Sequence, residues 1–371
     1  MEADVFTMLK ICYVSSIAVH SKRWIEAFSQ KGYETFLITD KKAWMPFSPR
    51  RTPICSLPEL NKQNFPKRLI PNTFTMVRVL RRISPDVINL QALHYYAPAI
   101  FLSNHPYILT SWGLEVLELP QSDLIDKNLA RIAAVLARRI IVDAQCLKEI
   151  WVSLGIPKNK IDVIPFGVDT NTFHPASNRD NLREQLDIKN ADTLIISTRP
   201  FYASHYNIEC LIKAFPLVLK SHKSVKLVLK GVGPLEAYFK RLVEKLKIAG
   251  NVHFVGLVPH HEVARYLASA DIYVSTSFID STSVSLLEAM ACGLAPVVTD
   301  IPGNREWIQD GVNGFLFPPR DSRALAEKII QLIENPKLRE LFGQRNFQIV
   351  KERAEWQKCV SRMEAIYKSL L

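Results

Sequence analysis

Short apolar runs alternate with amphipathic segments along nearly the whole chain. Runs of strand length lie at 9–16, 35–40, 87–90, 107–111 and 140–143 in the first half, and at 194–198, 226–230, 252–255, 272–275 and 296–298 in the second. Segments with helical spacing of apolar residues separate them, the clearest at 22–31, 208–221 and 235–249. A regular alternation of strands and helices predicts parallel sheets with helices on both faces, an α/β fold.

A segment rich in proline, glycine and turn-forming residues interrupts this alternation at 164–177. With 371 residues in all, the halves on either side are each long enough to bury a core of their own. We therefore expect two domains of similar size, joined by a short seam near residue 170.

Composition and cysteine usage are typical of a soluble cytoplasmic protein. The chain is 48% hydrophobic and 22% charged, and no run approaches the roughly 20 apolar residues of a membrane span. The start of the chain lacks the basic region and small-residue cleavage site of a secretory signal. Its six cysteines are dispersed and form no C-x-x-C pair, so we expect reduced thiols rather than disulfides or a zinc site.

Basic charge is concentrated in one part of the chain. The net charge is +11, and the stretch from Lys41 to Arg82 has ten basic residues against a single acid, Glu59, with large apolar residues interleaved. Such a mixture suits an anionic membrane surface, where each cation contributes about 1 kcal/mol. Two alternatives would also explain this mixture of residues. The basic residues could form a solvated face while the apolar ones pack in an ordinary core, or the stretch could bind an acidic glycan acceptor. Nucleic acid is disfavoured because no recognition motif accompanies the charge.

Two acidic residues with seven residues between them stand out in the second half. Asp280 lies in a polar loop after an apolar strand, and Glu288 lies about one turn into the helix that follows from near Val284. Open α/β sheets bind ligands in this crevice, where helix N-termini offer N–H groups to phosphate. A structural alternative is that Ser285 and Glu288 form a capping box that ties down the helix start.

The residues around this pair resemble the acidic-x7-acidic signature of retaining glycosyltransferases of family 4, the glycosyl transferases group 1. The run from Glu288 to Gly293 fits closely, whereas Asp280 replaces the usual Glu and Ser-Thr-Ser replaces Gly-Phe-Gly. Further landmarks at 164–175, 231–234 and 311–314 extend the resemblance over nearly the whole chain. The resemblance implies a GT-B fold, two doubly wound Rossmann-like domains facing a central cleft.

The same resemblance assigns acceptor binding to one part of the chain and donor binding to the other. Residues 1–170 would form the acceptor-side domain, and residues 171–354 would form the domain that binds the nucleotide-sugar donor. The helix expected over 355–371 often crosses back to the first domain in such enzymes.

On the donor side, the family pattern implies that Glu288 holds the ribose hydroxyls and that Asp280 lies by the donor sugar. Backbone N–H groups at Ser283 and Val284 would meet the diphosphate. Arg199 follows the first strand of the second half and is our expected phosphate ligand, because its planar fork can contact two oxygens of a leaving group that gains negative charge. An exposed charge at a strand end is the alternative for Arg199.

Two further donor-side features, one tyrosine and one glycine turn, carry weaker signals. The lysine that usually accompanies the arginine is missing, and Tyr206 stands in its place. Tyr206 could donate one neutral hydrogen bond, which does not replace an ammonium. Gly231 and Gly233 follow a strand and open a helix, and the resemblance places this turn near the donor, where small residues would give clearance.

On the acceptor side the chain departs from many family members. His20, within His20-x2-Arg23-Trp24, could contact donor or acceptor, or serve in capping or packing. Trp112 stands where a His is common, and Glu115 stands for an Asp. Trp112 could be a platform for a sugar ring or a core residue.

The implied reaction is retaining sugar transfer by front-face attack, with a glycan or lipid-linked glycan as acceptor. We expect no protein nucleophile, no metal and no cofactor, because the chain lacks an Asp-x-Asp motif in a plausible loop and the nucleotide-sugar is the co-substrate. A peripheral position on the inner face of the membrane would fit the basic stretch. The alternative is a non-catalytic nucleotide-sugar-binding protein on the same fold, which the missing lysine and the change to Trp112 favour.

Overall fold

The computed structural model describes residues 9–15, 19–39, 52–57, 65–91, 96–122, 124–175 and 180–371. The chain divides into two compact units, one of Met1–Pro165 with Val360–Leu371 and one of Phe166–Cys359. The divide lies five residues before the seam expected at 170. Among the described residues, none of the helices combines the length and hydropathy that crossing a membrane requires.

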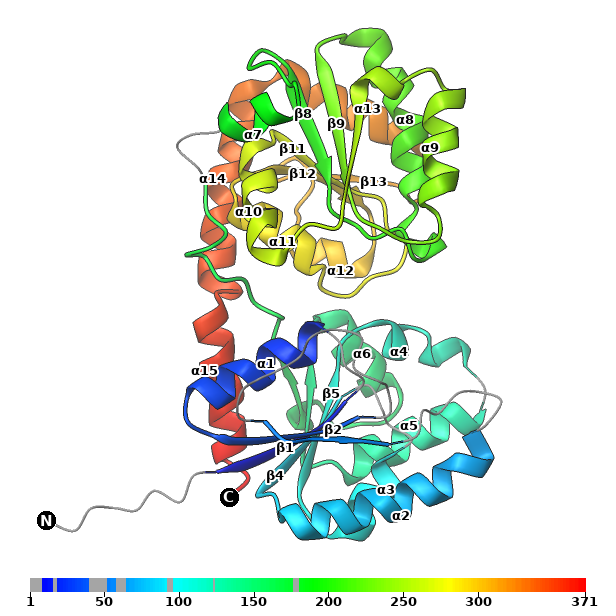
Figure 1. Cartoon of the computed structure of the whole chain (residues 1–371), viewed down its shortest axis with the longest axis vertical. Helices are drawn as coiled ribbons and strands as arrows, with labels where there is room; N and C mark the ends of the chain where they lie inside the picture. Colours follow the sequence, from blue (N-terminus) through cyan, green and yellow to red (C-terminus); the bar gives the residue numbers. More distant parts are fainter. Residues whose placement is uncertain are drawn as a thin grey trace, which may run out of the picture. The chain divides into compact units, whose positions relative to one another are not determined.

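The first unit is built on a parallel sheet in the order β3-β2-β1-β4-β5-β6-β7 (Figure 1). Its strands are β1 (Lys10–Ser15), β2 (Glu34–Thr39), β3 (Ile54–Ser56), β4 (Val87–Gln91), β5 (Tyr107–Ser111), β6 (Arg139–Val142) and β7 (Ile161–Val163). Its helices are α1 (Val19–Gln30), α2 (Phe65–Ile83), α3 (Ala97–Ser103), α4 (Leu114–Leu117), α5 (Leu124–Leu136) and α6 (Gln145–Ser153). The strands that the sequence predicts in this half are present, and β3 and β7 are additional short strands.

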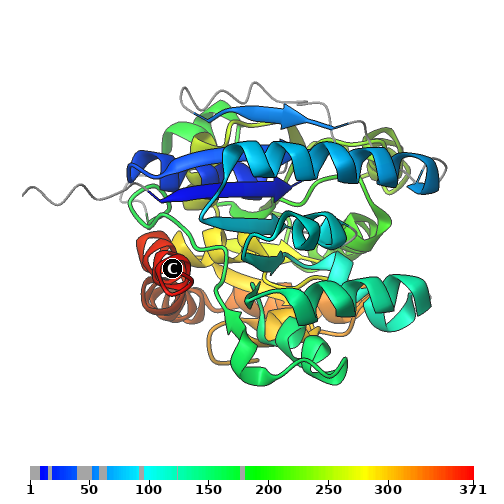
Figure 2. The same ribbon diagram turned by 90° about the horizontal axis from the view of Figure 1, so that it is seen from below.

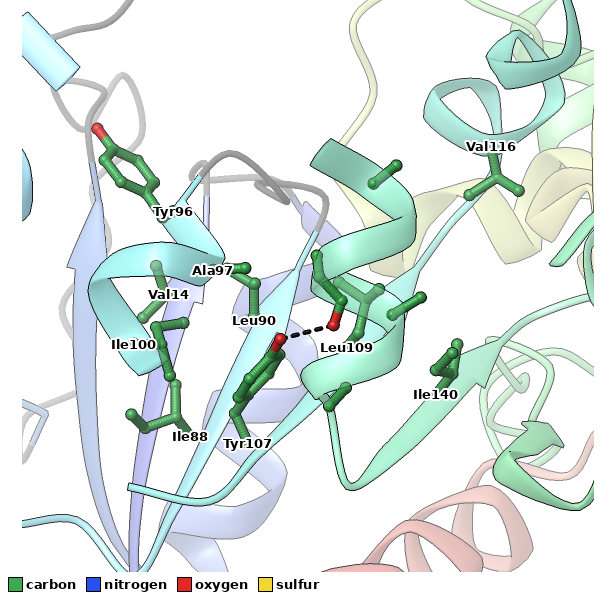
Figure 3. Packing of buried hydrophobic residues seen from close by; sticks show 14 of the residues in the cluster. Val14, Ile88, Leu90, Tyr96, Ala97, Ile100, Tyr107, Leu109, Val116 and Ile140 are labelled. Carbon is green, nitrogen blue, oxygen red and sulfur yellow. Dashed lines mark hydrogen bonds between the residues drawn. The ribbon is translucent and has the colours of Figure 1, made fainter. Parts of the chain in front are cut away.

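Helices α2, α3 and α5 lie side by side over one face of this sheet, as Figure 2 shows. The core beneath them contains apolar residues of four neighbouring strands, among them Val14, Leu90, Leu109 and Ile140 (Figure 3). Within that core the Tyr107 hydroxyl donates to the carbonyl oxygen of Ala133 at 2.6 Å and fixes α5 on the sheet.

The last helix, α15 (Trp356–Lys368), packs on the opposite face of the first sheet. Asn89 on β4 donates to the Tyr367 hydroxyl at 2.7 Å, and the Tyr367 ring meets Phe28 of α1 edge to face. Near the start of β2, the Tyr33 hydroxyl donates to Glu364 at 2.6 Å. These contacts hold the end of the chain on the first unit.

The second unit has a parallel sheet in the order β10-β9-β8-β11-β12-β13. Its strands are β8 (Thr193–Ser197), β9 (Val225–Lys230), β10 (Val252–Gly256), β11 (Ile272–Ser275), β12 (Ala295–Thr299) and β13 (Phe315–Phe317). Its helices are α7 (Asp180–Gln185), α8 (Ile208–Ser221), α9 (Glu236–Lys245), α10 (His260–Ser269), α11 (Val284–Ala291), α12 (Pro302–Arg305), α13 (Ser322–Glu334) and α14 (Pro336–Arg353). Two apolar cores, one on each face, enclose the sheet.

The strand order of the second sheet defines where a ligand fits. The chain runs from β8 outward through β9 to β10, then returns to β11 on the other side of β8. Doubly wound sheets bind ligands at such a switch point, beyond the carboxyl ends of the two central strands. A ligand bound there would contact the residues that follow β8 and β11.

Candidate donor site

Helix α11 starts at that switch point. Ser283 is its N-cap, and its hydroxyl accepts from the backbone N–H of Leu286 at 3.3 Å. The suggested capping box of Ser285 and Glu288 is therefore wrong, because the helix begins two residues earlier. Glu288 lies one turn into the helix and is free of any capping task.

Arg199 joins the end of β8 to the loop after β11. Its Nε and Nη2 donate to the Ser277 hydroxyl at 3.1 and 2.8 Å, and Nη1 donates to Ser283 and Ser285 at 2.9 and 3.1 Å. Nη2 also forms an ion pair with the carboxylate of Asp280. A guanidinium has five N–H groups, so each of them has a partner. Arg199 is buried, and its interpretation as an exposed charge at a strand end is wrong.

The surroundings keep this guanidinium charged. Burial lowers the pKa of Arg199, but the negative charge of Asp280 and its hydrogen bond to the guanidinium outweigh burial, so the pKa lies above its ordinary value. The guanidinium carbon lies 4.8 Å from the centre of the Tyr206 ring, a cation–π distance. At the position of the missing lysine, Tyr206 therefore offers the face of its ring to Arg199 instead of a second cation.

Glu288 is the other charged residue of the switch point. Its side chain is 8% exposed, and Oε1 lies 2.6 Å from Nε2 of His260, whose own side chain is 56% exposed. His260 opens α10, and its ring packs against Phe173. Burial lowers the pKa of Lys230, at the end of β9, while the negative charge of Glu288 raises it. The segments that follow β9 and β10 thus bring Lys230 and His260 to the carboxylate of Glu288.

His260, Lys230 and the Arg199 partner Ser277 are functional candidates that the sequence reasoning missed. Lys230 directly precedes Gly231 at a predicted strand end, which was the available signal. His260 follows a proline at a helix start and has no spacing cue toward Glu288, which is 28 residues further along the chain.

The loop carrying Asp280 rests on the segment after β12. A Cβ on Gly303 would lie 2.0 Å from the carbonyl oxygen of Ser281, so only glycine allows this approach. The Thr299 hydroxyl donates to the carbonyl of Ser277, and Asn304 donates to the carbonyl of Thr299 at 2.8 Å. These buried contacts fix the backbone on which Asp280 is presented.

Gly231 and Gly233 make room for the chain itself. A Cβ on Gly231 would lie 2.5 Å from the carbonyl oxygen of Arg199, and one on Gly233, at φ +156°, would lie 2.3 Å from the carbonyl carbon of Phe201. The Phe201 N–H donates to the carbonyl of Val232 at 3.0 Å. The space that the two glycines leave is thus occupied by the backbone of residues 199 and 201. A contact between this turn and the donor stays a prediction.

The acceptor-side candidates lie in the first unit and are engaged locally. The Trp112 ring stacks on the buried Trp24, with centroids 6.2 Å apart, and its backbone N–H donates to Glu115 at 2.6 Å. Burial raises the pKa of Glu115, while the N–H groups of Trp112, Glu115 and Gly113 lower it. Glu115 therefore holds the first turn of α4. The side chain of His20 lies outside the described residues, although its backbone belongs to α1.

The first sheet has its own switch point, between β1 and β4. Gln91 ends β4 there, with a fully buried side chain. Neither of its amide atoms has a hydrogen-bond partner within the described part of the chain. Sequence reasoning did not single out Gln91, because a lone glutamine at a strand end carries no motif.

Comparisons with known proteins agree with this architecture. The family described as Glycosyl transferase 4-like matches residues 10–144, and Glycosyl transferases group 1 matches residues 178–348. N-acetyl-alpha-D-glucosaminyl L-malate synthase of Bacillus anthracis is 31% identical over 190 residues, covering 51% of this chain and 49% of that protein. A phosphatidylinositol N-acetylglucosaminyltransferase component from Arabidopsis thaliana is 28% identical over 214 residues, covering 57% and 45%. The chain spans about half the length of the curated relatives it matches.

Among solved structures, Anabaena HepE in complex with UDP superposes with a TM-score of 0.83 at 19% identity, over 98% of this chain and 100% of that one. HepE in complex with UDP-glucose gives the same TM-score at 18% identity, over 97% and 100%. These similarities confirm the expected α/β class and the GT-B fold. The two family matches, which together span most of the chain, show that it belongs to the family-4 glycosyltransferases, the glycosyl transferases group 1.

Proposed function

We propose that this protein is a retaining glycosyltransferase that moves a sugar from a nucleotide-diphosphate sugar to a hydroxyl acceptor. The observation that carries the proposal is the convergence of Arg199, Asp280 and Glu288 at the switch point of the second sheet. The HepE complexes contain UDP and UDP-glucose, which supports a nucleotide-sugar as the ligand class here.

In this proposal Glu288 anchors the ribose. Its carboxylate is buried and already bonded through one oxygen to His260, so the other oxygen can accept from a ribose hydroxyl. Carboxylates form strong charge-assisted hydrogen bonds in such sheltered places. His260, on the exposed side of the pair, would face the entering nucleotide.

Arg199 and the start of α11 would neutralise the diphosphate. Because every N–H of Arg199 is engaged, a phosphate oxygen must replace one of its serine partners, Ser283 or Ser285, on Nη1. The backbone N–H groups at Ser283 and Val284 add the partial positive charge of a helix N-terminus. Asp280, held by Arg199, would orient a hydroxyl of the donor sugar.

The chemical step then needs little from the protein beyond positioning. The bond between the sugar carbon and the phosphate oxygen breaks, the acceptor oxygen attacks the same face, and its proton passes to the leaving phosphate. No protein nucleophile and no metal take part in this scheme. Fixed charges around the leaving group would lower the barrier.

A second candidate is a non-catalytic nucleotide-sugar-binding protein. Two observations favour it: the N–H groups of Arg199 are saturated by the protein, and Tyr206 supplies no cation. Donor hydrolysis by the wild type and by Asp280→Ala separates the two candidates. Equal hydrolysis rates in the two proteins, together with tight donor binding by the wild type, would contradict the glycosyltransferase proposal.

The direct test of donor binding is a thermal-shift screen against a panel of nucleotide-sugars. A true donor stabilises the folded protein by mass action, by about 2.7 kcal/mol at one hundred times its Kd. We expect a rise in melting temperature with the true donor, and no rise for Glu288→Ala. A wild type that no nucleotide-sugar stabilises would contradict both candidates.

For the acceptor we propose a glycan or lipid-linked glycan, used at the inner face of the membrane by a cytoplasmic, peripheral protein. The relative from Arabidopsis thaliana carries phosphatidylinositol in its name, which supports a lipid-linked acceptor. Much of the basic stretch Lys41–Arg82 lies outside the described residues. Of its described members, Arg78, Arg81 and Arg82 are exposed on α2.

A further inference from the structure

Helix α5 places its apolar residues the opposite way from an ordinary amphipathic helix. Its sheet-facing side consists of small residues, Ala130, Ala133 and Ala134, which are fully buried. The large apolar residues point outward: Leu124, Ile125, Ile132, Val135 and Leu136 are all exposed, the first two at 76% and 70%. A helix that covers a sheet normally buries its large apolar stripe.

The orientation of α5 is fixed by specific contacts. The Tyr107 hydroxyl on β5 donates to the carbonyl of Ala133 at 2.6 Å, and Figure 3 shows this bond beneath the helix. The alanines also let the helix lie close to the strands. Turning α5 to bury its leucines and isoleucines would break this bond and force large side chains into a packed core.

The neighbouring helices continue the same surface. On α2, Ile70 and Phe74 are exposed one turn apart, and Arg78 and Arg81 follow on the same stripe at helical spacing. On α3, Phe101 and Leu102 are exposed. The three helices lie side by side over one face of the first sheet (Figure 2). Exposed apolar side chains on one face at this density mark an interaction site.

The charge of the three helices identifies the occupant. Among the residues whose side chains the structure describes, α2, α3 and α5 contain five basic residues and one acid, Asp126. Apolar side chains beside basic ones are the composition of a face that lies in a bilayer interface. A second copy of this chain would oppose like charges across the contact, so it fits less well.

We propose that the outer face of α2, α3 and α5 docks on an anionic lipid bilayer, with the apolar side chains of α3 and α5 entering the interface and the α2 arginines meeting the headgroups. This inference rests on the proposed membrane association and extends it from the basic stretch to α3 and α5. It is independent of sugar transfer, so it is tested without a donor.

The test is co-sedimentation with two kinds of vesicle, phosphatidylcholine alone and phosphatidylcholine mixed with phosphatidylglycerol. We expect the wild type to bind the mixed vesicles at low salt and to dissociate as salt rises. Leu124→Gln with Ile125→Gln should weaken binding roughly tenfold, because two apolar side chains leave the interface. Arg78→Gln with Arg81→Gln should weaken it about 30-fold, at about 1 kcal/mol for each cation.

Matched controls come from exposed residues elsewhere in the chain. Leu257→Gln with Leu371→Gln removes two leucines that are 78% and 75% exposed, and Lys220→Gln with Lys223→Gln removes two exposed cations of the second unit. Both control pairs should bind the mixed vesicles like the wild type. Unchanged melting temperatures in all four double variants would exclude unfolding as the cause.

Two outcomes would overturn the proposal. One is wild-type binding by Leu124→Gln with Ile125→Gln, and the other is a wild-type dimer in analytical ultracentrifugation that the same variant converts to monomer. The donor-induced thermal shift, measured on the same samples, keeps the two proposals apart. A variant that loses vesicle binding but keeps the donor-induced shift has lost only its docking face. A missing shift in every sample, including the wild type, would contradict the sugar-transfer proposal.

Discussion

His260 and Glu288 meet at 2.6 Å, Nε2 to Oε1, so that a largely exposed imidazole covers a buried carboxylate. The carboxylate belongs to helix α11 and the imidazole to helix α10. In the proposed function this carboxylate anchors the ribose of the donor. A nucleotide entering this site would meet His260 first and Glu288 behind it.

Glu288→Gln should weaken donor binding while preserving the shape of the side chain. A neutral amide loses the charge-assisted hydrogen bonds to ribose and to His260, which are about twice as strong as neutral ones. We expect donor affinity to fall by about tenfold or more, measured by titration calorimetry. Glu262→Gln, which changes an exposed partner of Arg265 on α10, is the control and should bind like the wild type. Equal affinity of both variants would contradict the ribose role.

Asp280→Asn should destabilise the second unit, because it leaves the buried guanidinium of Arg199 without its counter-ion. Removing one partner of a buried ion pair costs about 3 kcal/mol or more. Chemical denaturation would measure the change in the free energy of unfolding. The matched control is Asp300→Asn, which breaks the exposed pair with Arg305 and should cost less than about 1 kcal/mol. Similar losses in both variants would mean that burial of Arg199 has no energetic consequence.

Gly303→Ala should disturb the loop that presents Asp280. The added Cβ would lie 2.0 Å from the carbonyl oxygen of Ser281, so the loop or α12 must shift. Overpacking of this kind costs about 1–3 kcal/mol, and donor binding should weaken with it. Gly250→Ala is the control, because a Cβ there meets nothing within 4 Å. A Gly303→Ala protein with wild-type stability and donor binding would show that this support is dispensable.

Acid should loosen the attachment of α15 to the first unit. Burial raises the pKa of Glu364, but its bonds with Lys31, Tyr33 and Lys368 outweigh burial and lower the pKa from 4.5 to about 2. Because the folded pKa is the lower one, the stabilisation is present above about pH 4.5 and is lost as pH falls toward about 2.

The measurement is the free energy of unfolding of wild type and Glu364→Gln between pH 7 and pH 2. The wild type should be more stable at pH 7 by about 1–2 kcal/mol, since the partners lie partly in solvent. The two proteins should converge in acid. A constant difference across this pH range would show that the charge of Glu364 does not hold the helix.

The sequence by itself determined the features that depend on neighbouring residues. The alternation of apolar strands and amphipathic helices predicted two parallel sheets, because the period of the apolar positions distinguishes a strand from a helix. The segment from Ser275 to Asp300 placed Asp280 after a strand and Glu288 within a helix, since both lie in one continuous stretch. The three-residue strands β3, β7 and β13 escaped prediction because so short a run carries no periodicity.

Only the tertiary structure decided which residues meet. Arg199 and Asp280 are 81 residues apart in sequence, and the position of β11 beside β8 brings them together. Sheet order likewise brings His260 to Glu288 and puts Phe201 against Gly233. The outward face of α5 was also invisible, because an apolar stripe in a sequence does not state which side packs on the sheet. Long-range pairing and helix orientation are set by packing, and the chain carries no local record of either.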